Sequence, residues 1–360
     1  MKPKLALYWA ASCGGCEIAV VDVQEHILTI ADFFDIVLWP VAMDYKYKDV
    51  EALADGEITL CLFNGSIRNS ENEHMVRVLR AKSKVLVAFG SCAQEGCIPG
   101  LANLFTRQAI WDYVYRESPS TVNEQGIFPQ PVTQVPEGKI EIPVMWDTVK
   151  PLDRIVEVDY YVPGCPPQSD QILNVVLAVM DILKNGKPLP PRGTVLGAGD
   201  KTCCDECGRE RRDKKIRKFV RPHEIIPDPS VCLLDQGIVC CGPATRSGCG
   251  AKCTRVNVPC RGCYGPPPDS PDPGAKMISA LASVIDASEP EEIDKVLATL
   301  ADPVGTFYRY GLAHSLPRVR PGACLVEGRC RPRDDRTPAQ AQVAAPSTSS
   351  TPQQAARERA

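Results

Sequence analysis

Cysteine is the residue type that most needs an explanation in this sequence. The chain has 360 residues and 18 cysteines, and thiols in this number indicate either disulfide bonds or bound metal. The apolar run 5–11 near the N-terminus is at the short end of the length of the apolar region of a signal peptide, contains Tyr8 and Trp9, and leads directly into a cysteine motif. We interpret it as a buried strand rather than an export signal. Disulfides are rare in proteins that are not exported, so metal is the better explanation.

A first set of four cysteines follows short apolar runs that suit buried strands. They are Cys13 and Cys16 in C-G-G-C, Cys92 in G-S-C, and Cys165 in P-G-C-P-P. The carboxyl ends of parallel strands meet at one edge of a sheet, so these loops are expected to bring the four thiolates together. Four thiolates satisfy a 4Fe–4S cluster. They would also satisfy a structural zinc ion, and C-x-x-C alone occurs in redox dithiols. The combination of three strand-end motifs favours the cluster.

A second set of cysteines lies downstream of residue 190, where regular periodicity almost disappears. Tight turns rich in Cys, Gly and Pro are what two further clusters require. Zinc knuckles are the alternative, but His223 is the only histidine between residues 190 and 300. The eight ligands that we select are Cys204, Cys207, Cys232, Cys240, Cys249, Cys253, Cys260 and Cys263. Cys203 and Cys241 are adjacent to two of them and either choice is reversible. The spacing does not say which four residues share a cluster.

The elements that must position these cysteines alternate in the first half of the chain. Strands are predicted at 4–10, 35–40, 58–63, 85–89 and 156–162, and helices at 17–30, 70–81 and 169–183, the last with Ser169 as its N-cap. This order predicts an α/β fold with a doubly wound, largely parallel sheet. The segment 117–149 is predicted to be an insertion or long loop. Further helices are expected at 275–286 and 290–300.

Three segments follow from the same pattern. Residues 1–190 are expected to form the sheet domain with the first cluster, and residues 191–330 a smaller irregular iron–sulfur domain with two more clusters. Residues 331–360, rich in Pro, Ala, Ser, Thr and Gln, are expected to be a disordered tail.

The motifs ASCGGCE, GSCAQEGCIPG and PGCPP resemble those of the small subunit of nickel–iron hydrogenases, whose N-terminal domain is flavodoxin-like and holds the proximal cluster. The later motifs P-A-T-R-x-G-C-G-A-x-C and P-C-R-G-C-x-G-P are similar to those of the cytoplasmic, methyl-viologen-reducing and deazaflavin-non-reducing type. This resemblance covers about residues 1–320. It implies that Cys13, Cys16, Cys92 and Cys165 hold the proximal 4Fe–4S cluster, and that two 4Fe–4S clusters, medial and distal, lie downstream.

The resemblance also implies partners. A nickel–iron large subunit would split dihydrogen, and electrons would leave through an iron–sulfur adaptor subunit to a heterodisulfide reductase-like flavin complex. No paired motif that holds nickel is present in this sequence, so no catalytic residue is predicted here. A redox module of complex I type, unconnected to hydrogen, and a zinc-binding scaffold are the two alternatives.

The sequence gives no support for nucleic acid or a membrane as a partner. A net charge of −3 and a pI near 5.9 give no reason to expect nucleic acid. No apolar run approaches the roughly 20 residues that span a membrane, so a membrane partner is not expected. The resemblance to the cytoplasmic type implies a cytoplasmic location. The basic stretch 209–221 is interpreted first as a solvated face, then as a docking site for an acidic redox partner.

Several residues near the motifs receive no firm role from the sequence. Cys61 is expected in the core, and Cys97 either packs inertly or tunes the proximal cluster, since oxygen-tolerant relatives carry an extra cysteine at this point of the motif. Cys324 and Cys330 have no partner motif and stay unassigned. Glu17 and Glu95 lie near two expected ligands, and we assign neither a proton-transfer role.

Overall fold

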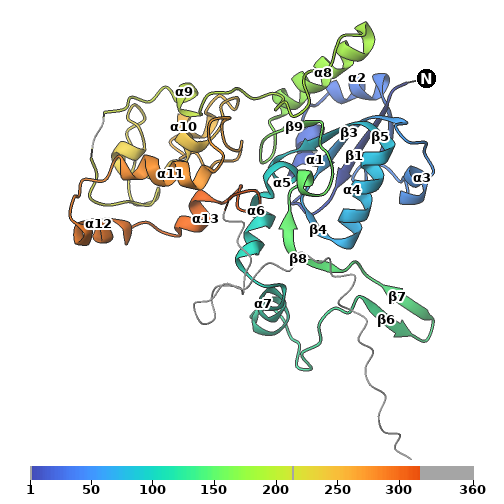
Figure 1. The fold of residues 1–360 in the computed structure, drawn as a ribbon, viewed down its shortest axis with the longest axis horizontal. Helices are drawn as coiled ribbons and strands as arrows, with labels where there is room; N and C mark the ends of the chain where they lie inside the picture. Colours follow the sequence, from blue (N-terminus) through green and yellow to red (C-terminus); the bar gives the residue numbers. More distant parts are fainter. Residues whose placement is uncertain (1, 213–214, 317–360) are drawn as a thin grey trace, which may run out of the picture. The chain divides into compact units, whose positions relative to one another are not determined.

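A five-stranded parallel sheet organises the first half of this computed structural model, which describes residues 2–212 and 215–316 (Figure 1). Its strands are β1 (Lys4–Trp9), β2 (Asp35–Leu38), β3 (Ile58–Asn64), β5 (Ser83–Phe89) and β9 (Tyr160–Val162). Their order is β2-β1-β3-β5-β9, and every neighbouring pair is parallel. This is the flavodoxin-like strand order, in which the order reverses beside the first strand. The predicted α/β fold is therefore confirmed.

Helices cover both faces of this sheet, because alternate side chains of each strand point to opposite faces. Leu5 and Leu7 of β1 pack in one cluster with residues of α1 (Gly15–Val21), α2 (His26–Phe33) and α8 (Ser169–Asn185). Ala6 and Tyr8 pack on the other face with α4 (Ser70–Lys82). Both faces are buried, which explains why the strands read as continuous apolar runs.

Two details of the helix predictions are wrong. The single helix expected at 17–30 is two helices, α1 and α2, separated at Gln24, whose φ is 57°. Ser169 is already helical, and the N-cap is Gln168, whose backbone N–H donates to the Gln171 side chain at 3.3 Å. The predicted end of this helix is confirmed, because Gly186 adopts the left-handed conformation that terminates helices.

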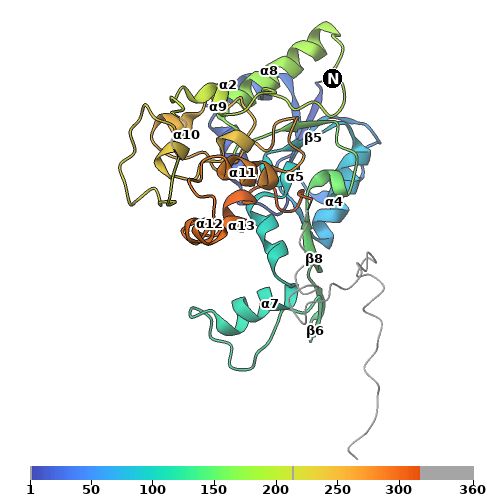
Figure 2. The ribbon, with the colours of Figure 1, turned by 60° about the vertical axis from the view of Figure 1, so that its left-hand side comes forward.

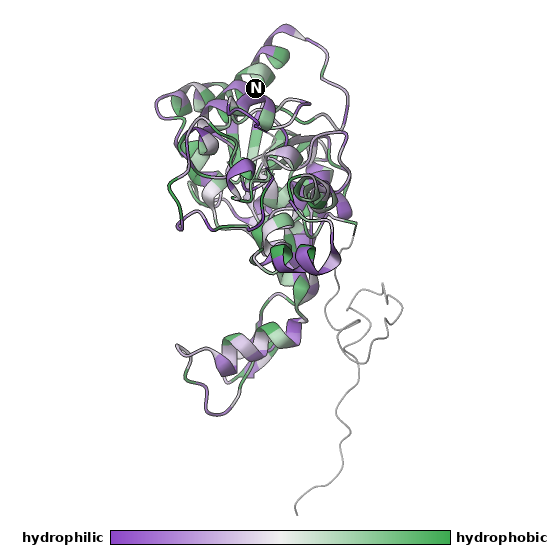
Figure 3. Cartoon of the chain, turned by 90° about the vertical axis from the view of Figure 1, so that its left-hand side faces the viewer, coloured by the Kyte–Doolittle hydropathy of each residue, from purple (hydrophilic) through white to green (hydrophobic). Residues whose placement is uncertain are grey.

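The predicted insertion contains regular structure. β6 (Val132–Val135) and β7 (Gly138–Glu141) form an antiparallel hairpin, and β8 (Met145–Lys150) pairs antiparallel with β4 (Ile67–Asn69). α7 (Arg107–Asp112) precedes the hairpin (Figure 2). We call residues 104–148 the arm. None of them is buried, although apolar residues occur along the arm (Figure 3). The arm therefore has no hydrophobic core of its own.

Short helices and turns make up the cysteine-rich second half, as expected. Its helices are α9 (Cys204–Cys207), α10 (Lys252–Arg255), α11 (Pro273–Ala282), α12 (Pro290–Leu297) and α13 (Pro303–Phe307). Three further short helices belong to the first half: α3 (Tyr47–Glu51), α5 (Ser91–Glu95) and α6 (Cys97–Gly100). In the second half, buried cysteines pack with Phe219, Leu233, Ile238 and Met277 in one core cluster. Because cysteines make up much of this core, apolar burial alone is not expected to stabilise the fold of the second half, and a bound group or cross-link is needed.

Contacts place all described residues in one compact unit, Met1–Gly322. The predicted boundary near residue 190 stays a prediction. The predicted tail 331–360, Cys324 and Cys330 lie outside the described residues. In the part of the chain that the structure describes, no helix has the length and apolar character to cross a membrane.

Candidate functional site

The first set of cysteines gathers at the carboxyl edge of the parallel sheet. Cys13 lies in the loop between β1 and α1, and Cys16 lies in the first turn of α1. Cys92 lies in α5 after β5, and Cys165 follows β9. Cys16 interacts electrostatically with both Cys13 and Cys165. Cys97 is hydrogen-bonded to both Cys92 and Cys165. The structure thus brings the four sequence-predicted residues together, from loops up to about 150 residues apart.

Glycine is required where these loops approach each other. Gly90 has φ 83°, and a Cβ atom added there would lie 2.4 Å from the Cys16 sulfur. A side chain at residue 90 would therefore displace a proposed ligand. The Gly15 backbone N–H also donates to the Cys13 sulfur at 3.4 Å.

The chemistry of this donor set fits an iron–sulfur cluster. Burial raises the pKa of Cys16 above its ordinary value, and the neighbouring thiols and Glu17 raise it further. A group of thiolates crowded in this way needs a cationic partner to stay ionised. No group of three or more His, Cys, Asp or Glu among residues 2–212 and 215–316 converges as ligands of one metal ion. A four-iron cluster needs no such convergence, because each thiolate binds a different iron atom.

Cys97 lies among these cysteines. Its side chain is fully buried, and its sulfur is 3.6 Å from the Cys165 sulfur. Its backbone has a φ of 48°, which is uncommon for a residue with a Cβ atom. The Cys97 N–H donates to the carbonyl of Tyr310 at 2.9 Å. The structure therefore places this thiol beside the expected ligands, while Cys61 lies fully buried in the core as predicted.

The second set of cysteines forms two neighbouring groups that meet at Cys260, whose backbone N–H donates to the Cys240 sulfur at 3.3 Å and whose thiol interacts electrostatically with Cys204. One small cavity is lined by Cys203, Cys204, Cys207, Cys232 and Cys240. A Cβ atom added to Gly242 would lie 3.0 Å from the Cys204 sulfur and 3.7 Å from the Cys240 sulfur. The other group consists of Cys249, Cys253, Cys260 and Cys263, which interact with one another electrostatically.

Cys203 connects the two groups. Hydrogen bonding with Cys203 lowers the pKa of Cys249 to about 6 and that of Cys260 to about 7. The same hydrogen bonds raise the pKa of Cys203 itself. Cys203 therefore lies within hydrogen-bond reach of both sulfurs, and its single S–H proton can be donated to one of them at a time. Cys241 is buried, and its sulfur lies 3.8 Å from the carbonyl of Thr306.

Two threonine hydroxyls, which the sequence analysis did not single out, lie against cysteine sulfurs. The Thr254 Oγ1 is 3.1 Å from the sulfur of Cys207, and the Thr245 Oγ1 is 3.4 Å from that of Cys260. Both threonines are buried. Hydrogen bonds to sulfur are one of the means by which proteins set cluster potentials. Both threonines belong to the motif P-A-T-R-S-G-C-G-A-K-C-T, so their closeness in sequence to cysteines could have identified them.

The basic stretch 209–221 is largely neutralised in its described part, which omits residues 213 and 214. The Arg209 guanidinium donates to the carbonyls of Thr254, Asp228 and Val231. Arg209 therefore connects the loop of residues 228–231 to the end of α10, next to the second cysteine set. Arg217 pairs with Asp286 at 3.0 Å. Arg209 is a structural residue, which neither the solvated-face nor the docking interpretation anticipated.

Residues beside the two cysteine sets contact each other directly. The hydroxyl of Ser91 donates to the carbonyl of Cys263, and the backbone of Cys165 hydrogen-bonds to the Cys263 thiol. Tyr310 interacts electrostatically with both Cys165 and Cys263. These contacts put a residue of the second set against the first set.

The two acidic residues that the sequence placed near expected ligands are both buried, which the sequence did not predict. Glu17 is 1% exposed and accepts hydrogen bonds from Trp39 and Asn64. Glu17 therefore forms hydrogen bonds inside the core in addition to lying in the first turn of α1, where a carboxylate is favourable. Burial raises its pKa.

A second acidic group includes Glu95. Its side chain is buried, and one of its carboxyl oxygens lies 3.9 Å from the His314 Nδ1. The His314 Nε2 lies 3.2 Å from Asp153. Burial raises the pKa of Glu95 to about 7. These three residues are far apart in the sequence, so no local pattern could have grouped them.

Comparison with known proteins agrees with this geometry. Residues 13–179 match the family model described as NADH ubiquinone oxidoreductase, 20 Kd subunit. The iron–sulfur subunit of the F420-non-reducing hydrogenase of Archaeoglobus profundus is 44% identical over 87% of this chain and 97% of its own length. The corresponding F420-non-reducing hydrogenase subunit of Methanothermobacter marburgensis is 35% identical over 88% of this chain and 96% of its own length.

More distant relatives carry similar names. The sulfhydrogenase 2 subunit delta of Pyrococcus furiosus is 26% identical over 83% of this chain and 99% of its own length. Among solved structures, a chain of the Dm. baculatum [NiFeSe]-hydrogenase is similar over 76% of this chain and 96% of its own, at 20% identity and a TM-score of 0.47. From the identity and coverage of the first two relatives, this chain belongs to the family of F420-non-reducing hydrogenase iron–sulfur subunits, components of an oxidoreductase complex.

Proposed function

We propose that this chain is the electron-transfer subunit of a nickel–iron hydrogenase and that it binds three 4Fe–4S clusters through twelve cysteines. The observation that carries this proposal is the gathering of Cys13, Cys16, Cys92 and Cys165 at the carboxyl edge of the sheet. These four residues would hold the proximal cluster. Iron–sulfur clusters supply one-electron redox chemistry when bound.

The grouping of the second set supports a partition of its ligands. Cys204, Cys207, Cys232 and Cys240 line one cavity, and we assign them to one cluster. Cys249, Cys253, Cys260 and Cys263 interact with one another, and we assign them to the other. In this assignment Cys203 is a neighbour of both Cys249 and Cys260 that can donate its one thiol proton to either sulfur.

The contact between Cys165 and Cys263 supports the order of the clusters. Because Cys263 touches a proximal ligand, the group 249–263 would be medial and the group 204–240 distal. The protein would bury these sites and donate hydrogen bonds to sulfur, which sets the potential of each step.

Exposed apolar side chains beside the proximal loops support a partner on that face. Trp9 is 40% exposed, Ile18 57% and Ile98 46%. Exposed apolar residues next to a functional site are typical of protein–protein interfaces. We propose that a nickel–iron large subunit, where dihydrogen would be split, covers this face. An iron–sulfur adaptor subunit and a heterodisulfide reductase-like flavin complex would accept the electrons, in the cytoplasm.

The test is elemental analysis of the complex purified without oxygen. About twelve iron and twelve sulfide per chain, with a visible iron–sulfur spectrum and a nickel-containing subunit that co-purifies, are expected. Zinc in place of iron, with no visible absorption, would refute the proposal and support the scaffold alternative. Iron without a nickel-containing partner would support the complex I-like alternative, which the hydrogenase names of the relatives do not favour.

A further inference from the structure

Tyr310 contacts residues that flank both cysteine sets. Its backbone carbonyl accepts a hydrogen bond from the N–H of Cys97, beside the first set, at 2.9 Å. Its ring lies against Gly262, which precedes Cys263 of the second set, because a Cβ atom added to Gly262 would be 3.6 Å from the ring. Tyr310 therefore occupies part of the space between a loop of the first set and a loop of the second.

The segment that carries Tyr310 is held against the first half of the chain. A Cβ atom added to Gly96, between α5 and α6, would be 2.5 Å from the Ala313 side chain, so this close approach requires glycine. The next residue, His314, has its Nε2 3.2 Å from Asp153. These contacts fix the backbone that follows Tyr310, so its side chain cannot readily turn away from the cysteines.

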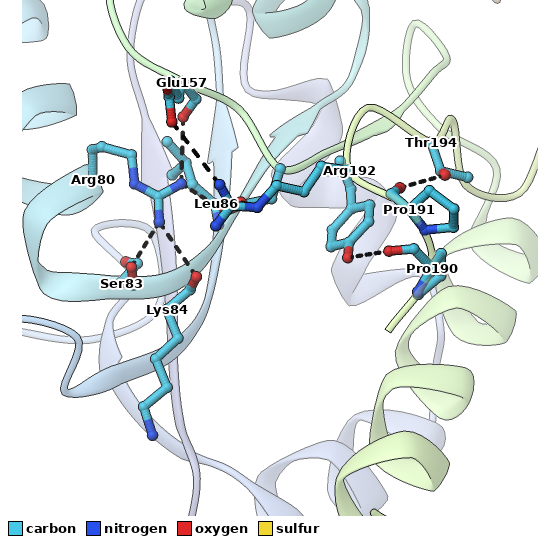
Figure 4. A network of polar contacts seen from close by, with 11 residues as sticks. Arg80, Ser83, Lys84, Leu86, Glu157, Pro190, Pro191, Arg192 and Thr194 are labelled. Atoms are coloured by element: carbon cyan, nitrogen blue, oxygen red, sulfur yellow. Dashed lines mark hydrogen bonds and ion pairs between the residues drawn. The ribbon is translucent and has the colours of Figure 1, made fainter. Parts of the chain in front are cut away.

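The Tyr310 hydroxyl forms no hydrogen bond among residues 2–212 and 215–316, although its side chain is half-buried. Other tyrosine hydroxyls have acceptors. That of Tyr160 donates to the carbonyl of Pro190 at 2.8 Å (Figure 4), and that of Tyr264 donates to the Gln171 side chain at 2.6 Å. A phenol carries its proton at neutral pH. The Tyr310 O–H is therefore a donor without an acceptor.

Cysteine sulfurs are the acceptors on which this hydroxyl acts. It interacts electrostatically with the thiols of Cys165, Cys263 and Cys97, and most strongly with that of Cys165. The backbone contact between Tyr310 and Cys97 points to the same sulfur, because the Cys97 sulfur lies 3.6 Å from the Cys165 sulfur. Cys165 is therefore the acceptor that the geometry favours.

We propose that, with a cluster bound, the Tyr310 hydroxyl donates a hydrogen bond to the Cys165 sulfur and so raises the reduction potential of the proximal cluster. The inference rests on the function proposed above, in which Cys165 is a ligand of that cluster. Reduction adds negative charge to the cluster and its sulfurs, so a donor at a ligand sulfur stabilises the reduced state.

EPR-monitored redox titration of the complete subunit complex, purified without oxygen, tests this proposal. Tyr310→Phe keeps the ring and loses the hydroxyl. It should make reduction of the proximal cluster about fivefold less favourable, which is about 40 mV at about 59 mV per tenfold change. The proximal signal is the one that Cys165→Ala removes. An unchanged proximal potential, or a shift confined to another cluster, would overturn the proposal.

Tyr308→Phe is the matched control. Tyr308 lies on the same segment, and its hydroxyl is hydrogen-bonded to Asp272, with no cysteine among the groups that act on it. This variant also loses a phenol hydroxyl and should leave the proximal potential unchanged. An equal shift in the two variants would show that the effect comes from disturbance of the segment, and the proposal would be wrong.

Electron–nuclear double resonance of the complex exchanged into D2O identifies the donor directly. The hydroxyl deuteron of Tyr310 should couple to the reduced proximal cluster, and this coupling should disappear in Tyr310→Phe and persist in Tyr308→Phe. A spectrum unaltered by Tyr310→Phe would refute the hydrogen bond. Absence of iron from the unsubstituted complex would refute the function proposed above, whereas full iron content with an unaltered spectrum would refute only the role of Tyr310.

Discussion

The Ser91 hydroxyl donates a hydrogen bond to the backbone carbonyl of Cys263. Ser91 precedes Cys92 in α5, while Cys263 is 172 residues further along the chain than Ser91. This single bond joins the loop of the proposed proximal cluster to a proposed ligand of the medial one. It is a point at which the relative position of two clusters can be altered without removing a ligand.

Ser91→Ala should slow electron transfer between the first and second cysteine sets and destabilise the fold by about 1 kcal/mol, because a hydroxyl donor is lost. Freeze-quench EPR of the reduction of each cluster measures the first effect, and thermal unfolding the second. Ser120→Ala, at an exposed position, is the control and should change neither. Unaltered transfer kinetics in the Ser91 variant would mean that this contact is not part of the path.

Cys97→Ala should retain about twelve iron per chain, because Cys97 is proposed to be a neighbour and not a ligand of the proximal cluster. Cys165→Ala should lose about four iron, one cluster. Iron and acid-labile sulfide analysis of both variants measures this difference, with Cys61→Ala as a buried control. Equal losses from the Cys97 and Cys165 variants would make Cys97 a ligand.

Thr254→Val should make the potential of the cluster bound by Cys207 more negative by about 40 mV. In this structure the Cys207 thiol donates to the Thr254 hydroxyl at 3.1 Å, and that hydroxyl donates to the Ala251 carbonyl at 3.0 Å. A cluster-bound Cys207 thiolate can only accept, so the hydroxyl would have to turn from Ala251 to the sulfur, and a hydrogen bond of about 1 kcal/mol corresponds to this shift for one electron. EPR-monitored redox titration measures it. Thr254→Ser keeps the hydroxyl and should keep the potential; a shift of similar size in both variants would contradict the assignment.

Glu95 should make stability depend on pH. Burial raises its folded-state pKa to about 7 from an ordinary value of 4.5, so the folded state binds a proton more tightly than the unfolded state. The resulting stabilisation, about 3 kcal/mol at most, is fully present below pH 4.5 and is lost as the pH rises through 7. The pKa of His314 is also raised, through its bond to Asp153, and its contribution has the same sign.

Glu95→Gln should therefore flatten the dependence of stability on pH between about 5 and 8. Denaturant unfolding at several pH values measures this, with Glu157→Gln, whose side chain is 91% exposed, as the control. A slope unchanged by the Glu95 substitution would show that the carboxyl is ionised throughout this range.

Local sequence patterns predicted the bounds of those helices and strands whose structure depends mainly on their own residues. The strands β1, β3 and β5 and the helix α4 lie within two residues of the predicted bounds, because apolar runs and helical periodicity report burial directly. The break between α1 and α2 was missed, because it depends on the backbone of Gln24. The hairpin β6–β7 was missed because its residues are exposed and have no apolar alternation.

The sequence by itself was sufficient to predict that strand-end loops bring Cys13, Cys16, Cys92 and Cys165 together, while their role as iron ligands stays a prediction. Thiolate chemistry and the geometry of a parallel sheet are sufficient for that inference. Only the tertiary structure decided that Cys203 lies beside both Cys249 and Cys260, that the Cys260 N–H reaches the Cys240 sulfur, and that Ser91 reaches Cys263. Such contacts join residues far apart in a segment of irregular turns, where no periodic pattern records which groups will meet.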